Sequence, residues 1–518
     1  MATSHHHFMK KILLLLLFPL GLFGQPSVKA SRDWIDKNGH SILAEFKALL
    51  SIPNHASDIP NIERNAARLM KMFGDRGFAM RLLQEPGAPP VVYGEYKVKN
   101  ATRTLCFYAH YDGQPVDPAL WKLDAFKPEL YDNAMYRNGK PIPMPLAGQP
   151  ISEEWRLYGR SASDDKAPIV AMMAAIDALK AADIGYTSNI KLFFDGEEES
   201  SSPHIETYMK KHGDLFKDIS VWLLCDGAVY QSGDPSFKFG GRGITGMQLT
   251  VYGPSRPLHS GHYGNWAPVP GQMLARLLTS MKAEDGTVLI EGFYDSVEPI
   301  TAFERQQVAR APNIDAQLKE ELGLAFTEGN GQTLNERLLL PSLTIRGLAS
   351  GSVGDKARNV IPSTAIAELG MRLVKGNDPE KMLDLVEAHI RKQGWHIVYE
   401  EPDHAVRMKY PKIVKVVRDK DGFPAIKVTM DQPQIMGVIN GVKSFTGDRA
   451  VFLPSSGGSN RVNNAIYDVL KTPAISVNMV NHDNNQHAEN ENVRIGNLWY
   501  GVDLVSVLMT LPPDMVKK

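Results

Sequence analysis

The sequence has little cysteine and almost no net charge. Only two of its 518 residues are cysteines, which excludes a disulfide framework and any cysteine-rich zinc site. Cys106 and Cys225 lie in apolar, strand-like runs, so we expect buried free thiols. The 57 Lys and Arg residues nearly balance the 58 Asp and Glu residues, which gives a net charge of −1. Without a basic excess, binding to nucleic acid is not expected.

Long apolar runs are also scarce, and the longest stands near the N-terminus. Two lysines precede the apolar stretch 12–24, which is shorter than the about 20 residues of a bilayer span. A basic start followed by a short apolar core is typical of a signal peptide. We therefore expect residues 1–30 to be a signal peptide, cleaved near Gln25 or Ser31. The protein would be exported (periplasmic or secreted), with no membrane span after cleavage; an uncleaved anchor is the alternative.

The rest of the chain has an ordinary globular composition, with 43% hydrophobic and 22% charged residues. Short apolar runs alternate with segments in which apolar residues recur at helical spacing. This alternation predicts an α/β fold whose catalytic domain is a mostly parallel sheet covered by helices. The strands are expected at residues 104–109, 190–194, 221–225 and 473–480, and the helices at 33–50, 58–73, 167–181 and 493–511.

The middle of the chain has a different pattern. Strands with alternating polarity and two long helices follow the Gly-rich stretch 240–243, which is a natural hinge. We expect a smaller α+β module, residues 243–402, inserted between the two parts of the catalytic domain, residues 31–242 and 403–518. Its strands are expected at residues 246–252, 342–346 and 365–374, and its helices at 270–281 and 379–393.

Acidic and imidazole side chains follow three of the predicted strands. Because functional sites in open parallel sheets form beyond the carboxyl ends of the strands, these side chains are expected to meet. Each has an ordinary explanation when taken alone, such as a helix cap or a solvated face. Together they would repel one another unless cations lay among them. They are His110 and Asp112 after the first strand, residues 197–199 after the second, and Asp226 after the third.

A Gly- and Ser-rich loop, residues 159–166, adds two aspartates at a helix start. One histidine with several carboxylates suits zinc, or a harder divalent ion such as manganese. Two such ions could share a bridging carboxylate and activate one water molecule. A second histidine would come from the loop 481–492, where His482 and His487 are both candidates.

Seven strings carry a resemblance to a known family. In chain order they are LCFYAHYDGQP, YGRSASDDKAP, FFDGEEESSS, LLCDG, PLHSGHYG, SSGGSN and QHAENE, from about residue 104 to 491. The chain resembles the dinuclear zinc hydrolases that include carnosinase-like dipeptidases, aminoacylases and glutamate carboxypeptidases, and the dipeptidase branch fits best. The resemblance implies that the inserted module is a lid and dimerisation domain, and that the protein is a homodimer.

The resemblance also implies a ligand set for two divalent metal ions per subunit, zinc or manganese. His110 and Asp226 would bind the first ion, and Glu199 and His487 the second. Asp164 would bridge both ions, with a cis peptide bond after it. His487 is favoured over His482 because its surrounding string matches the family.

Catalytic roles follow from the same resemblance. Glu198 would be the general base, because Glu198-Glu199-Ser200 fits the family pattern better than a frame starting at Glu197. Asp112 would not bind a metal ion itself but would hold the ring of the metal-binding His110 in place. His259 would reach a neighbouring active site and polarise the scissile carbonyl; an ordinary surface histidine is the alternative.

The substrate's carboxylate would be received by a guanidinium, whose fork suits a carboxylate, and by a tight turn. These positions are Arg372, Gly458, Ser459 and Asn359. The chain departs from the family pattern at Ser161 and Ser201, where glycine is common, and in the segment 262–270.

Taken together, the sequence predicts an exported metallopeptidase that hydrolyses dipeptides or C-terminal residues of short peptides. An N-acyl amino acid amidohydrolase that uses the same dinuclear site is the alternative, and a substrate panel separates the two. A catalytically silent scaffold is a third possibility, which the presence of a suitable residue at every metal position argues against.

Overall fold

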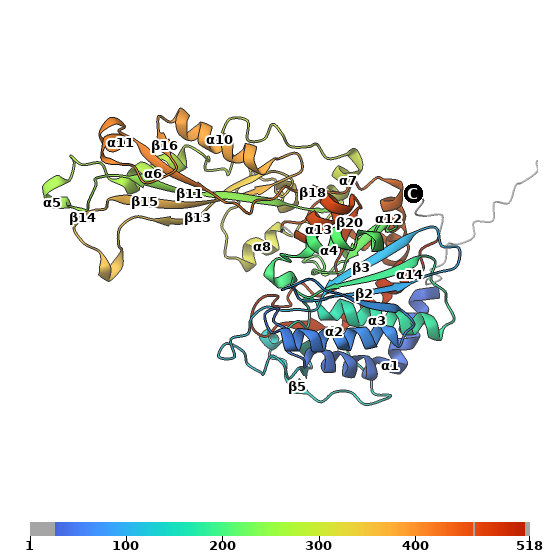
Figure 1. The fold of residues 1–518 in the computed structure, drawn as a ribbon. Helices are drawn as coiled ribbons and strands as arrows, with labels where there is room; N and C mark the ends of the chain where they lie inside the picture. Colours follow the sequence, from blue (N-terminus) through green and yellow to red (C-terminus); the bar gives the residue numbers. More distant parts are fainter. Residues whose placement is uncertain (1–25, 459–460, 513–518) are drawn as a thin grey trace, which may run out of the picture.

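The structure is a computed structural model that describes residues 26–458 and 461–512. Figure 1 shows two regions: a main region built around one large sheet, and an elongated extension that carries its own sheet. The predicted signal peptide core at residues 12–24 lies outside the described residues. Among the helices that are described, none is both long enough and apolar enough to cross a membrane.

The main region is built on an eight-stranded sheet. Its four central strands, β7, β3, β8 and β20, are parallel, and antiparallel pairs occur toward both edges. The predicted α/β fold with a mostly parallel sheet is therefore confirmed. In order across the sheet, the strands are β1 (Ala79–Leu83), β2 (Val91–Tyr96), β7 (Asn189–Asp195), β3 (Thr104–His110), β8 (Val221–Leu224), β20 (Ala474–Val477), β9 (Ser236–Lys238) and β19 (Val451–Leu453).

Helices cover both faces of this sheet, which explains why β3 is buried along its whole length. Leu105 and Phe107 of β3 point into the core under one set of helices, while Cys106 and Tyr108 point into the core on the other face. Cys106 and Cys225 are buried free thiols, as expected. The first face carries α1 (Pro26–Leu50), α2 (Ile59–Gly74), α3 (Lys166–Ala181), α12 (Pro433–Thr446) and α14 (Ile495–Met509), and the second carries α4 (Ile205–Lys211) and α13 (Arg461–Ala465).

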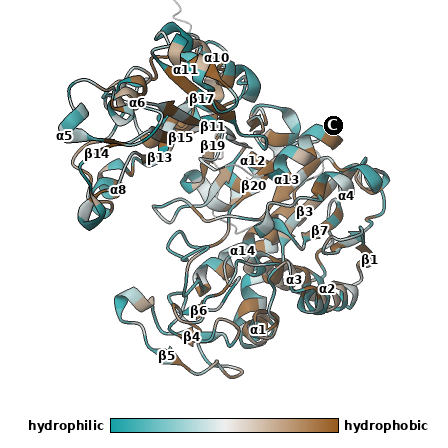
Figure 2. Cartoon of the chain, turned by 60° about the vertical axis from the view of Figure 1, so that its left-hand side comes forward, coloured by the Kyte–Doolittle hydropathy of each residue, from teal (hydrophilic) through white to brown (hydrophobic). Residues whose placement is uncertain are grey.

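The extension is built on a five-stranded, largely antiparallel sheet with two helices packed on one face. In Figure 2 hydrophobic residues concentrate in the strands, while α5 at the far end of the extension is hydrophilic. In order, the strands are β13 (Ser342–Ala349), β15 (Thr364–Leu373), β11 (Gly243–Tyr252), β17 (Ile413–Arg418) and β16 (His396–Val398), and the helices are α6 (Pro270–Thr279) and α10 (Pro379–Lys392).

The predicted end of the inserted module at residue 402 is wrong for one strand. β17 lies beyond that residue, yet it pairs antiparallel with β11, so the sheet of the extension continues to Arg418. The end of the module was predicted too early because a polar loop and the short helix α11 (His404–Lys409) precede β17 and interrupt the pattern of apolar strands.

Several short elements complete the chain. A four-stranded sheet in the main region contains β21 (Asn492–Arg494), β6 (Arg156–Tyr158), β4 (Glu129–Tyr131) and β5 (Pro141–Ile142). Where the two regions join, β10 (Gly240–Gly241) pairs with β18 (Ile426–Lys427). The extension also holds β12 (Leu258–His259), α5 (Ser260–Tyr263) and β14 (Val360–Ile361). The segment between α6 and β13 contains α7 (Ala302–Arg310), which packs against β19 of the main sheet, and the short helices α8 (Asp315–Glu321) and α9 (Leu334–Arg337).

Candidate metal centre

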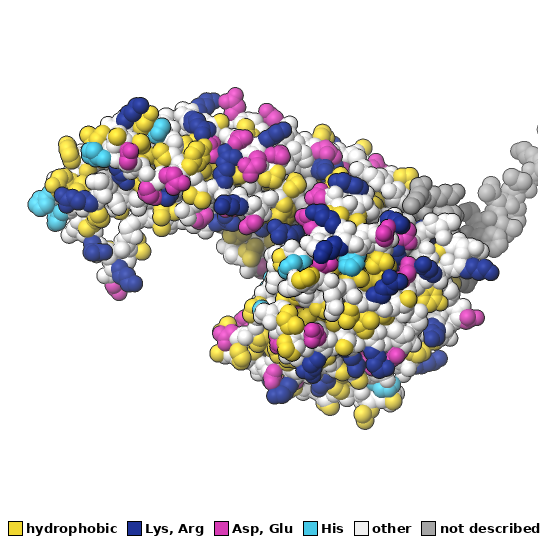
Figure 3. Space-filling view, in the orientation of Figure 1, with side chains coloured by type: hydrophobic (Ala, Val, Ile, Leu, Met, Phe, Trp, Pro, Cys, Tyr) yellow, Lys and Arg dark blue, Asp and Glu magenta, His cyan; other side chains and the backbone are white. Residues whose placement is uncertain are grey.

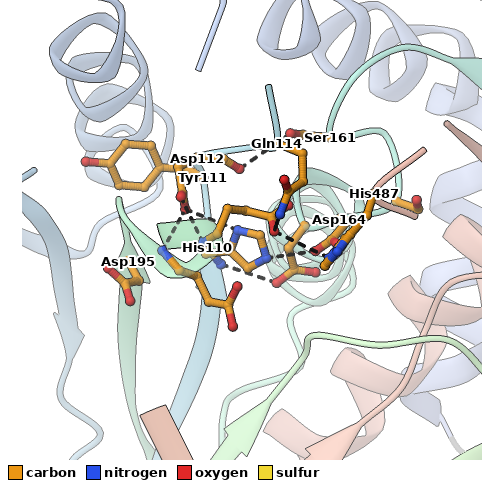
Figure 4. A network of polar contacts seen from close by, with 12 residues as sticks. His110, Tyr111, Asp112, Gln114, Ser161, Asp164, Asp195 and His487 are labelled. Atoms are coloured by element: carbon orange, nitrogen blue, oxygen red, sulfur yellow. Dashed lines mark hydrogen bonds and ion pairs between the residues drawn. The ribbon is translucent and has the colours of Figure 1, made fainter. Parts of the chain in front are cut away.

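The predicted site residues of the main region do meet at the carboxyl ends of the central parallel strands (Figure 4). His110 is the last residue of β3, and Asp226 lies two residues after β8. Glu198 and Glu199 begin the short helical turn that follows β7. Two loops complete the set, one before α3 that carries Asp164 and one between β20 and β21 that carries His487.

These six residues form two groups whose ligand atoms lie within 4.8 Å of one another in each group. The carboxylate of Asp164 lies between the two groups. Its Oδ1 lies 2.8 Å from His110 Nε2, and its Oδ2 lies 3.2 Å from His487 Nε2. One carboxylate oxygen therefore faces each imidazole. The first group is His110, Glu198 and Asp226, and the second is Asp164, Glu199 and His487.

The electrostatics of the centre fit bound cations. Burial, reinforced by the charge of Asp164, raises the pKa of Glu199 to about 7 and that of Asp226 to about 6. Burial opposes ionisation of Asp164 as well, but hydrogen bonds with His110 and His487 hold the pKa of this carboxyl well below its usual range. Its Oδ2 atom is buried and, apart from the 3.2 Å ion-pair contact with His487 Nε2, has no hydrogen-bond partner. Crowded acids and an unsatisfied carboxylate oxygen are what divalent ions would relieve, and nitrogen and oxygen ligands suit zinc or manganese.

Asp112 supports the centre from behind. Its Oδ1 lies 3.3 Å from His110 Nδ1, which is the contact that the resemblance predicts. The same carboxylate accepts the backbone N–H groups of Glu198 and Glu199, each at 3.0 Å. One buried side chain thus fixes both the ring of His110 and the turn that carries the two glutamates.

Glu491 is a second supporting residue, and the sequence reasoning missed its role. It is fully buried, four residues after His487, and its carboxylate holds the loop that carries Asp164. The only sequence signal is its place within the QHAENE string. Its donors, all 2.8–2.9 Å away, are the backbone N–H groups of Ser161, Ser163 and Asp164, the Ser163 hydroxyl and the Arg160 guanidinium. Glu491 therefore ties the loop of one imidazole to the loop of the bridging carboxylate.

The two serines that replace common glycines have left-handed backbones. The φ angle is 61° at Ser161 and 68° at Ser201, and residues other than glycine rarely adopt such positive φ angles. The Ser161 hydroxyl accepts a hydrogen bond from Asn54 at 2.9 Å. The peptide bond between Asp164 and Asp165 is cis, as the resemblance implies.

Glu197 and His482, the alternative candidates from the sequence, lie outside the two ligand groups. The side chain of Glu197 contacts Nδ1 of His204 at 2.9 Å and belongs to neither group. His482 is exposed and lines a separate cavity on the main region.

The predicted residues at the tip of the extension are not brought to this centre within one chain. His259 is exposed at the start of α5, where its Nδ1 accepts the backbone N–H of Gly261 at 3.0 Å. Asn359 is exposed beside it, and its carbonyl accepts the N–H of Ser260. Figure 1 shows α5 and β14 at the far end of the extension, and Figure 3 shows histidine side chains gathered there.

Two other predicted substrate contacts lie where the regions join. The backbone N–H of Arg242 donates to the carbonyl of Gly458 at 3.0 Å, and its guanidinium donates to the carbonyl of Arg372 at 3.5 Å. Arg242 therefore links the two positions. Ser459 lies outside the described residues.

A cleft of about 610 Å³ opens over the metal centre. In Figure 3 the surface is hollowed between the main region and the extension. The lining of the cleft includes Glu198, Glu199 and His487. It also includes Phe423 and Arg461, which were not predicted from the sequence. This size is within the ~300–1,000 Å³ range of small-molecule sites.

A mixed α/β main region, an inserted sheet and a buried His–carboxylate centre together define a metal-dependent hydrolase. The profile of peptidase family M20/M25/M40 matches residues 106–510. The chain belongs to this family, and it is a metal-dependent peptidase.

Similar proteins agree with this assignment. The chain is 23% identical to the Beta-Ala-His dipeptidase of Homo sapiens over 95% of its own length and 94% of the relative. It is 26% identical to the Cys-Gly metallodipeptidase dug1 of Schizosaccharomyces pombe over 69% and 74% of the two chains. Among solved structures, an M20 family metallo-carboxypeptidase, Sso-CP2 from Sulfolobus solfataricus, matches with a TM-score of 0.69 and 25% identity, covering 91% of this chain and 99% of the other.

Proposed function

We propose that this protein binds two divalent metal ions and hydrolyses dipeptides or removes C-terminal residues from short peptides. The observation that carries the proposal is the placement of Asp164 between two ligand groups, with one oxygen toward His110 and the other toward His487. The names of the relatives, two dipeptidases and a carboxypeptidase, support the substrate class.

The reaction would use Glu198 as its base. Bound divalent ions would lower the pKa of water and draw charge from the peptide carbonyl. Burial and the neighbouring acids raise the pKa of Glu198 above its usual range, which suits a group that must gain and return a proton. Glu198 takes the proton from the attacking water and delivers it to the leaving nitrogen as the C–N bond breaks. Asp112 keeps the ring of His110 in place throughout.

The substrate's free carboxylate would lie near Arg372 and the turn at Gly458. Both positions are adjacent to Arg242, at the side of the cleft where the two regions join. A dipeptide bound there would present its only peptide bond to the metal centre, whereas a longer peptide would lose its last residue.

The position of His259 supports a homodimer. Its exposed ring stands at the far end of the extension, away from the metal centre of its own chain (Figure 1). For His259 to polarise a scissile carbonyl, the extension of one subunit would have to reach the cleft of another.

Export is supported by the basic and apolar N-terminal segment. Of the two predicted cleavage points, Gln25 agrees better with the structure. Cleavage near Ser31 would cut within helix α1, where Ser31 is buried and hydrogen-bonded to Asp503. Mass determination of the mature protein recovered from outside the cytoplasm tests this choice, and a mass that retains residues 1–24 contradicts it.

A substrate panel tests the catalytic proposal. Purified protein, loaded with zinc or manganese and analysed for metal content, is assayed with dipeptides, tripeptides and N-acyl amino acids. The proposal predicts about two ions per subunit, rapid hydrolysis of dipeptides and loss of activity with a chelator. Faster hydrolysis of N-acyl amino acids would establish the amidohydrolase alternative instead.

A further inference from the structure

A second cavity, of about 590 Å³, lies in the main region and shares no lining residue with the cleft over the metal centre. Its wall is formed by α1, the end of α12, α14 and the segments around β6 and β21. Guanidinium groups supply most of its charged side chains, and we call it the arginine cavity. The cationic residues of the wall are Arg32, Arg137, Arg156, Arg449 and Arg494, and the anionic ones are Glu153, Glu154 and Asp483.

Every carboxylate of this wall is paired with a guanidinium group of the same wall. Asp483, for example, accepts hydrogen bonds from both Nη atoms of Arg156, at 2.8 and 2.9 Å. Two further carboxylates contact the arginines from behind the wall. The ion pairs are Arg156 with Asp483, Arg494 with Glu154, Arg32 with Glu153 and Asp503, and Arg449 with Asp234. Five guanidinium groups thus balance five carboxylates, and a bound cation would find no unpaired carboxylate.

Two of the five arginines keep N–H donors free. Arg137 makes no ion pair within residues 26–458 and 461–512, and its guanidinium carbon lies 5.4 Å from the centroid of the Tyr136 ring. Arg449 donates its Nε to Asp234 at 3.1 Å, and its Nη atoms have no acceptor among the described residues. Both arginines are exposed, so they lie at the mouth of the cavity. Their unused N–H groups have the fork geometry that suits carboxylates and phosphates.

Two buried atoms of the wall also lack a hydrogen-bond partner. They are the Nε atom of Arg156, a residue that is only 5% exposed, and the hydroxyl oxygen of Tyr500. Buried polar groups nearly always have a partner, so an unpaired one indicates a ligand or a water molecule. A guanidinium N–H can only donate, and a phenol hydroxyl has a proton to donate. No buried side-chain acceptor of the described wall is unpaired, so the missing partner is an acceptor.

The wall of the arginine cavity is connected to the metal centre through the chain. Residues 481–483 belong to the wall, and the same loop carries His487 four residues further on. Val229 also lines the cavity and follows Asp226 by three residues. Its backbone N–H donates to the carbonyl of Val480 at 2.8 Å, which fixes the start of the His487 loop. A ligand in the cavity would therefore contact the bases of two metal-binding segments.

We propose that the arginine cavity binds a small polyvalent oxyanion, such as a phosphate group, and that the bound anion stabilises the loop that carries His487. Because the charges of the wall balance, the anion is held by the free N–H and O–H donors rather than by an excess of positive charge. Binding energies at two coupled sites are reciprocal, so the anion raises the affinity for metal and the metal raises the affinity for the anion. Only this coupling rests on the proposed function; the anion site does not.

Anion-dependent thermal stability tests the site. The purified protein is melted with increasing phosphate, sulfate or succinate at constant ionic strength, with sodium chloride as the reference, both with bound metal and after chelation. Tyr500→Phe removes only a hydroxyl that has no partner, so it should fold as well as the wild type. Arg137→Gln removes a guanidinium that makes no ion pair with a described residue. Arg64→Gln, exposed on α2 and outside the cavity, is the matched control.

We expect an anion to stabilise the wild type and the control equally. In Tyr500→Phe and Arg137→Gln, the anion concentration that gives half of this stabilisation should rise by about 10-fold, because a hydrogen bond to a charged group is lost. Stabilisation by phosphate and sulfate but not succinate identifies a tetrahedral anion as the ligand. Stabilisation by succinate alone contradicts a phosphate site.

Two results would overturn the site: no stabilisation of the wild type by any of the three anions, or equal stabilisation of the wild type and both cavity variants. The coupling is measured as the rate at which metal passes to a chelating dye, with and without the anion. We expect the anion to slow this transfer several-fold in the wild type and in Arg64→Gln but not in Tyr500→Phe. All variants share one metal centre, so direct contact between anion and metal cancels in the comparison. Equal rates in a protein that binds the anion would overturn the link with His487. Melts of the metal-free protein need no peptidase activity, so failure of the proposed function leaves the test of the anion site intact.

Discussion

The main region and the extension place their predicted functional residues in opposite ways. In the main region, His110 and Asp112 are fully buried, and residues from five separate chain segments converge. In the extension, His259 and Asn359 are exposed at one end of the sheet, whereas Arg372 lies near the other. The difference follows from strand direction. Parallel strands send their carboxyl ends to one edge, whereas an antiparallel sheet distributes them over two.

The length of β15 sets the distance between Asn359 and Arg372. Asn359 precedes the strand and Arg372 is its penultimate residue. Ten extended residues at about 3.4 Å each span roughly 30 Å, so a single dipeptide cannot contact both residues of one chain. If both residues serve one substrate, they come from two subunits.

The sharpest test of the main region is Glu198→Gln. The amide keeps the shape of the side chain but cannot accept the proton of the attacking water. We expect the turnover number to fall by about 10³-fold or more, while metal content stays unchanged. Steady-state rates and metal analysis on the same preparation check this. Turnover near that of the wild type would remove Glu198 from the base role.

The matching test of the extension is His259→Ala, alone and mixed with Glu198→Gln. In His259→Ala alone, we expect the turnover number to fall by about 10²- to 10³-fold, because a group that polarises the scissile carbonyl is lost. After the two variants are dissociated and reassociated, we expect about one quarter of the wild-type rate, because half the dimers are mixed and each has one complete site. Rates that do not recover on mixing, in preparations shown to exchange subunits, would contradict a shared site.

Glu491→Gln tests the support of the bridging loop. Glutamine keeps one carbonyl acceptor but loses the charge that holds the Arg160 guanidinium and three backbone N–H groups. We expect metal affinity to fall by about 10- to 100-fold, with activity restored at high metal concentration. Competition with a chelating dye measures the affinity. Gln114→Ala, which removes a hydrogen bond to Glu199 without touching the loop, is the comparison. Unchanged metal affinity in Glu491→Gln would show that Glu491 only packs.

The smallest expected effect is on the stability of the metal-free protein. Folding raises the pKa of Glu199 to about 7 and that of Asp226 to about 6, mainly through burial. The folded state then binds more protons than the unfolded state, whose carboxyls titrate near pH 4. Stability is therefore lost as pH rises from about 4 to 7, and we expect the melting temperature to fall by several degrees.

Thermal melts with and without a chelator check this pH dependence. Bound divalent ions should reduce the loss, and so should the double variant Glu199→Gln/Asp226→Asn. A dependence of the same sign remains from Asp195 and Asp503, because burial raises the pKa of each to about 6. A metal-free melting temperature that rises over this interval would contradict the burial argument.

The sequence was most informative where local pattern and function coincide. Apolar runs that end at His110 or within three residues before Glu198 and Asp226 located both the sheet and the metal centre, because burial and catalysis depend on the same strand ends. Glu491 was missed because its role depends on backbone N–H groups more than 300 residues away in the chain, which leave no periodic signal. β17 was assigned to the wrong region for the same reason, since its partner β11 lies far earlier in the chain.

The place of β20 within the main sheet has a consequence for synthesis of the chain. This strand, residues 474–477, lies between β8 and β9, which are made about 240 residues earlier. The sheet cannot close, and His487 cannot join the other ligands, until residues 474–487 have left the ribosome. The extension is complete well before that point. A nascent chain would therefore emerge with its protruding arm formed and its enzyme core still open.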